Sequence, residues 1–172
     1  MIWLLLGCGG GGAGGVAPFD LAQMASLDRA WTWRDDEEDT LPPDAGALLH
    51  GQGGEGGVEL RRGERWEDAE PAGRLGLRLE GDLVLDGWSL DGAGEDTRVV
   101  LVADGATDGD HVSTGPVTCT AARAEPFTTW YATFDPVMDV DCGEWMHLVF
   151  AEDFGLVWMR SGEVELDLVA PY

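Results

Sequence analysis

The sequence of 172 residues has no asparagine. It also has no lysine, so all ten of its basic residues are arginine. The absence of lysine excludes Schiff-base chemistry and Ser–Lys catalytic pairs. Three cysteines are too few for a fold dominated by disulfides, and none belongs to a CxxC pair of the kind that binds structural zinc. No apolar run approaches the about 20 residues that a transmembrane helix requires. The sequence therefore predicts neither a membrane-spanning helix nor a structural zinc site.

Sequence motifs for catalysis are also missing. None of the four serines lies in a GxSxG or SxxK motif. The three histidines, His50, His111 and His147, are far apart and form no HExxH or HxH pair. The glycine runs lack the strand–turn–helix setting of a dinucleotide fingerprint or a P-loop. We therefore expect a protein that is not an enzyme, with no catalytic residue, no metal site and no cofactor.

Acidic residues dominate the charge of the chain. Thirty-three acidic residues against ten basic ones give a formal net charge of −23 and a pI near 4.1. A field this negative excludes nonspecific binding to nucleic acid and charge-driven adhesion to anionic lipid head groups. The 44% hydrophobic content, with eight tryptophans, nevertheless indicates a folded chain. Its length predicts a single β-rich domain, which we place over residues 19–172.

The N-terminus carries the clearest indication of where the protein acts. Leu5-Leu6-Gly7-Cys8 resembles the lipobox of bacterial lipoproteins, and a glycine-rich stretch follows it. The resemblance implies that residues 1–7 are a signal peptide and that Cys8 becomes the acylated first residue. It implies a lipid anchor in the outer membrane, because Gly9 rather than aspartate follows the cysteine. Residues 8–18 would then be the anchor and its tether, which reaches roughly 17 Å over about ten residues.

This N-terminus departs from a standard signal peptide in two respects. It has no basic residue before the apolar segment, and that segment is shorter than the usual 7–15 residues. A start codon further upstream would supply both features. The alternative is a short buried N-terminal strand with a free thiol at Cys8.

A two-residue hydrophobic period, which is typical of half-buried strands, begins at Val58. Leu75, Leu77 and Leu79 alternate with polar residues or glycine, Gly81-Asp82 indicates a reversal, and Asp86-Gly87 indicates a bulge. Further strands are expected over 98–103, 117–121, 130–134, 145–151, 154–159 and 164–168. We expect loops at the acidic run 35–39 and at 51–57, where five of seven residues are glycine, and a short helix or irregular lead-in over 16–30. The pattern predicts an all-β, antiparallel fold with little helix: a curved sheet, or a partly closed barrel or sandwich.

Both ends of the predicted domain resemble certain bacterial lipoproteins of unassigned role. Residues 31–35 (WTWRD) resemble their "WTYR" opening strand, and 154–157 (FGLV) with 165–169 (ELDLV) resemble their closing hairpin, "GVGLV…LELV". The resemblance implies a secreted, lipid-anchored domain on a curved antiparallel sheet, and it brings no activity with it. In the oxidising compartment that export implies, Cys119 and Cys142 are expected to form a disulfide; the alternative is two separately buried thiols.

Two groups of residues remain as candidates for binding. The acidic segment 104–110 fails the spacing of a calcium loop, and Asp139 and Asp141 share one strand face, where they would meet solvent or a cation. Trp31 and Trp33 share strand parity and would either line a ligand surface or fill the core. The sequence thus predicts a lipid-anchored envelope protein that acts by binding or as a structural part. The alternatives are an acidic cation-binding module and a hydrolase using a carboxylate pair such as Asp139 and Glu152.

Overall fold

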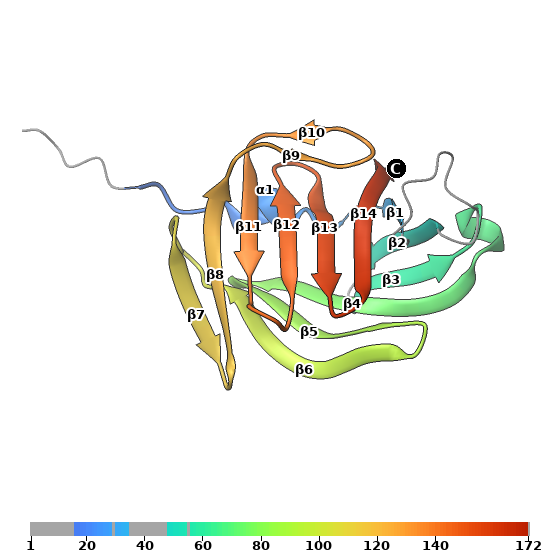
Figure 1. Cartoon of the computed structure of the whole chain (residues 1–172), viewed down its shortest axis with the longest axis horizontal. Helices are drawn as coiled ribbons and strands as arrows, with labels where there is room; N and C mark the ends of the chain where they lie inside the picture. The colour runs from blue at the N-terminus through green and yellow to red at the C-terminus, as the bar shows by residue number, and fades with distance from the viewer. Residues whose placement is uncertain (1–15, 29, 35–47, 55, 172) are drawn as a thin grey trace, which may run out of the picture.

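The computed structural model describes residues 16–28, 30–34, 48–54 and 56–171. The predicted signal peptide, Cys8, all of the tether before Val16, and the acidic run 35–39 lie outside these residues. Within them, the chain forms an antiparallel sheet of twelve strands that is nearly closed into a barrel (Figure 1). The all-β prediction is confirmed. The expectation of a single domain over 19–172 stays a prediction.

The twelve strands lie side by side in the reverse of their chain order, with one jump from β1 to β14, and β9 (Phe127–Thr128) and β10 (Thr133–Phe134) form a separate two-stranded sheet. From one edge of the sheet to the other they are β6 (Ala93–Val102), β5 (Asp82–Leu90), β4 (Glu70–Glu80), β3 (Gly57–Arg62), β2 (Leu48–Gly54), β1 (Ala30–Arg34), β14 (Val164–Pro171), β13 (Gly155–Ser161), β12 (His147–Ala151), β11 (Val137–Asp141), β8 (Val117–Ala124) and β7 (Asp110–Thr114). The first and last strands of the domain, β1 and β14, pair at the middle of the sheet. The opening-strand and closing-hairpin motifs are therefore neighbours in space.

The two edge strands approach each other and almost close the sheet. The backbone N–H of Val100 on β6 donates to Oγ1 of Thr114 on β7 at 3.0 Å. In Figure 1, β11–β14 run vertically and β3–β6 cross beneath them. This strong curvature depends on glycines: a Cβ at Gly73 or Gly76 would lie 2.0 or 2.1 Å from a carbonyl oxygen of β5. Only glycine permits the backbones of β4 and β5 to approach so closely at these points.

Outside the large sheet lie the short helix α1 (Leu21–Ala25) and the hairpin of β9 (Phe127–Thr128) and β10 (Thr133–Phe134), which is drawn above β11–β13 in Figure 1. Asp20 caps the helix by accepting the backbone N–H of Gln23 at 3.2 Å. The helix contacts β12, β13, β4 and β5 and thus lies between the two halves of the sheet. Among the described residues, no helix has the length and apolar character needed to cross a membrane.

The inner face of the sheet is packed with side chains. Trp31 and Trp33 are 1% and 0% exposed, and their rings stack with centroids 5.5 Å apart. Their indole N–H groups donate to the carbonyls of Phe154 and Leu156, at 2.8 and 3.2 Å. Each buried tryptophan removes about 150–250 Å² from water. The two rings are therefore core, the second of the two possibilities that their parity left open.

The glycine-rich segment 51–57 is not the loop that its composition predicts. Most of it belongs to β2 and to the start of β3. The reason is packing: a Cβ at Gly51 would lie 2.3 Å from Cζ3 of Trp33. A glycine in this strand makes room for the largest side chain of the neighbouring one.

Other boundaries also differ from the expected ones. Of the strand expected over residues 130–134, only Thr133 and Phe134 form one, β10, because Trp130 and Tyr131 lie in the loop between β9 and β10. β12 begins at His147 rather than at Trp145. Leu79, expected to point inward, is 40% exposed. The bulge at Asp86-Gly87 is confirmed by a register shift between β5 and β6.

Candidate functional site

The disulfide prediction is confirmed. Cys119 on β8 and Cys142, which directly follows β11, are joined, with Cα atoms 4.0 Å apart. The antiparallel register places Thr120 opposite Asp141, so the next residues outward along the two strands are the two cysteines. Both side chains are buried. Cys8, the predicted lipidation site, lies outside the described residues.

The acidic segment 104–110 uses its carboxylates to hold its own turns. Asp110 accepts the backbone N–H and the hydroxyl of Thr107 at 2.8 and 2.9 Å. These hydrogen bonds, first that from the backbone, lower the pKa of the Asp110 carboxyl. Asp108 accepts the backbone N–H of Arg123 at 2.6 Å. In the described part of the chain, no group of three or more His, Cys, Asp or Glu side chains is arranged to hold a metal ion.

The carboxylates proposed as a hydrolase pair have separate surroundings. Nε2 of His147 lies 2.9 Å from both carboxylate oxygens of Asp139. Glu152 follows β12, three positions beyond Val149, the residue that pairs with Asp139. At about 3.3 Å per residue, this places the Cα atoms of Asp139 and Glu152 about 10 Å apart along the strand direction. The structure pairs Asp139 with a histidine rather than with a second acid.

His147 lies in a polar row that crosses six neighbouring strands on the outer face of the sheet. Successive pairing partners in this row are His111, Thr120, Asp141, His147, Arg160 and Glu165. Beside the row is an open hollow of about 530 Å³, lined in part by Asp141, Glu144 and Arg160.

An imidazole held by a carboxylate, as His147 is held by Asp139, is an arrangement used for general-base catalysis. Ser161, next to Arg160, is buried and donates its hydroxyl to the carbonyl of Trp145 at 2.9 Å, so it is not presented to His147 as a nucleophile.

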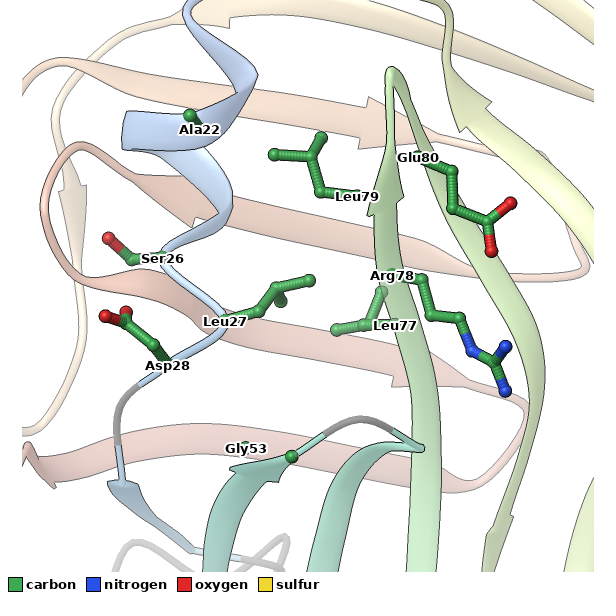
Figure 2. A pocket seen from close by; sticks show the side chains of 10 residues that line it. Ala22, Ser26, Leu27, Asp28, Gly53, Leu77, Arg78, Leu79 and Glu80 are labelled. Atoms are coloured by element: carbon green, nitrogen blue, oxygen red, sulfur yellow. The ribbon is translucent and has the colours of Figure 1, made fainter.

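A groove of about 730 Å³ lies between the strand β4 and the segment formed by α1 and the residues that follow it (Figure 2). Leu27 and Leu77 face each other across it, and Leu79 lies further along the same side of β4. Arg78 and Glu80 point to the other side of the strand, where they form ion pairs with Asp86 and Arg98. The groove is thus an open surface of mixed character, in which the three leucines lie beside polar residues such as Ser26 and Asp28.

A smaller cleft of about 330 Å³ lies between β1, β2 and the 3₁₀ turn η2 (Trp66–Asp68), and we call it the η2 cleft. Its lining residues are Ala30, Trp31, His50, Gly51, Gln52, Arg65, Trp66 and Glu67. This volume falls within the about 300–1,000 Å³ typical of small-molecule sites. Motif analysis missed the cleft, because Trp66 stands alone in a charged segment and meets β1 and β2 only in the folded chain.

Buried hydrogen bonds fix the η2 cleft in place. His50, 3% exposed, contacts the Gly63 carbonyl through Nε2 at 2.9 Å and Oγ1 of Thr32 through Nδ1 at 3.0 Å. Because a carbonyl only accepts hydrogen bonds, Nε2 carries the hydrogen. The histidine therefore ties the segment before η2 to the sheet. Its role is structural, as a satisfied buried side chain.

Searches against protein-family models, curated proteins and solved structures found no match to this chain.

Proposed function

We propose that this chain is a lipid-anchored domain of the bacterial cell envelope that acts by binding and not by catalysis. Cys8 is the acylated residue, and residues 1–7 are the signal peptide, which is removed. The glycine-rich tether separates the domain from the outer membrane. The observation that carries this proposal is the Cys119–Cys142 disulfide. Structural disulfides persist in exported proteins and are rare in the cytosol of most bacteria.

The disulfide also bears on Cys8 by elimination. The chain has three cysteines, and two of them are joined to each other. The third follows Leu5-Leu6-Gly7, the pattern that resembles a lipobox. A cysteine outside the disulfide and inside such a pattern is available for acylation.

The packing of the domain supports binding at its outer surface. The inner face of the sheet is filled by the two stacked tryptophans and their neighbours. Each of the clefts described above is lined in part by exposed residues. A partner or ligand would therefore contact the outer surface, which the tether holds clear of the membrane.

Metabolic labelling tests the anchor. The chain is expressed in a Gram-negative host behind an added basic n-region, labelled palmitate is supplied, and the membranes are separated. We expect label in the protein and its recovery in the outer-membrane fraction. The Cys8→Ala variant should carry no label and remain soluble in the periplasm, whereas Cys119→Ala should keep the label. Equal labelling of the protein and its Cys8→Ala variant would contradict the proposal.

A further inference from the structure

The lining of the η2 cleft combines the indole of Trp66, beside the buried rings of Trp31 and His50, with several polar groups. Trp66 is half-buried, and the guanidinium of Arg61 lies over its ring, 4.8 Å from the centroid. Arg61 is itself held by Glu59, at 2.9 Å. A cation over an indole restrains the plane of the ring. Trp66 borders the cleft, whereas Arg61 is not among its lining residues.

The polar groups of the cleft suit a ligand that both donates and accepts hydrogen bonds. Gln52, Arg65 and Glu67 are exposed at the lining. An amide offers donors and an acceptor, a guanidinium offers donors and a carboxylate offers acceptors. Together they match neighbouring hydroxyl groups, each of which donates and accepts.

Charge selects against anionic ligands. The charges of Arg65 and Glu67 oppose each other within the lining, so the cleft presents little net charge of its own. The whole chain carries −23, which repels anions. A neutral ligand is therefore favoured over an anionic one.

We propose that the η2 cleft binds one ring of a neutral saccharide, stacked on the indole of Trp66 and hydrogen-bonded by Gln52, Arg65 and Glu67. A sugar ring has an apolar C–H face and a rim of hydroxyls, which correspond to the indole and to the polar mouth. The site is preorganised, because His50 and Gly63 hold the segment before η2 against the sheet. The proposal rests on the proposed function in that the domain acts by binding, but not on its lipid anchor.

The test uses the full chain carrying Cys8→Ala, with its disulfide intact, so that the result is independent of acylation. Cellotriose, maltotriose and chitotriose are titrated separately, and binding is followed by NMR at the Trp66 indole N–H and the Gln52 side-chain amide. At least one of the three should give saturable shifts at both groups. Trp66→Ala should weaken that binding by about tenfold, with a smaller loss for Trp66→Phe, because stacking supplies much of the affinity.

Two controls separate stacking from general effects. Trp158→Ala removes another half-buried tryptophan, on β13, and should leave the affinity unchanged. Gln52→Ala changes an exposed side chain, so it keeps the fold and should still weaken binding. Trigalacturonate, an anionic trisaccharide, should bind more weakly than the neutral ones.

Three results would overturn the proposal: absence of saturable shifts with all three neutral trisaccharides, unchanged affinity in Trp66→Ala, or tighter binding of trigalacturonate. Loss of palmitate labelling would not affect it.

Discussion

Removing the disulfide should destabilise the domain by an amount that follows from its position in the chain. Cys119 and Cys142 are 23 residues apart, so their bond closes a loop of about 24 residues. The chain-entropy model assigns such a loop about 3.4 kcal/mol. This is a large share of the about 5–15 kcal/mol that typically stabilises a domain.

The double variant Cys119→Ala/Cys142→Ala should therefore unfold at lower urea concentration than the parent. For a domain of this size, about 3.4 kcal/mol corresponds to a fall in Tm of about 7–14 °C. Urea titration and calorimetry measure the two quantities independently. Reduction of the parent protein should reproduce the loss of stability, because it opens the same loop without substituting a residue.

Cys8→Ala is the matched control, since it removes a cysteine outside the loop and should leave the free energy of unfolding unchanged. A loss below about 1 kcal/mol in the double variant, with the urea m-value preserved, would refute the reasoning. It would mean that β8 and β11 hold this end of the sheet without the bond.

Three further predictions concern packing and charge. Gly51→Ala should cost about 1–3 kcal/mol of stability by calorimetry, because the new Cβ would lie 2.3 Å from the Trp33 ring, whereas Gly56→Ala, with nothing within 4 Å, should cost far less. The Tm of the parent should rise between about 0.01 and 0.1 M sodium chloride, because screening relieves the repulsion among its −23 charges; a constant Tm would show that the acids are compensated locally. Hydrogen bonds from Thr107 lower the pKa of Asp110, so its stabilising contribution is present above the ordinary carboxyl pKa and is lost as pH falls through the lowered one. Urea unfolding at a series of pH values should show a smaller loss on acidification in Asp110→Asn than in the parent.

Periodicity predicted those strands whose burial is determined by the alternation of their own side chains. Leu75 and Leu77 alternate with small or polar residues and lie in the core, as expected of a half-buried strand. The disulfide between Cys119 and Cys142 could be predicted from the sequence. Cys8 is assigned to lipidation, and two remaining cysteines in an oxidising compartment usually pair. In these cases the local pattern and the global packing agree.

The failures share a physical cause, which is that the deciding contact lies far away in sequence. Gly51 is a strand residue because Trp33 occupies the space a side chain would need. The composition around Trp130 predicts a strand, yet Trp130 lies in the loop between β9 and β10. The η2 cleft could not be predicted from the sequence. Trp66 on a turn and His50 on a strand both line it, and no sequence motif connects these two segments.

Peptide mapping of protein extracted from the envelope tests the central claim most directly. The protein is denatured without reduction, alkylated, digested and examined by mass spectrometry. We predict a mature chain that begins at an acylated Cys8, a linked Cys119–Cys142 peptide pair and no alkylated cysteine. A chain that retains Met1 and carries alkylated Cys8, Cys119 and Cys142 would contradict both the export and the anchor.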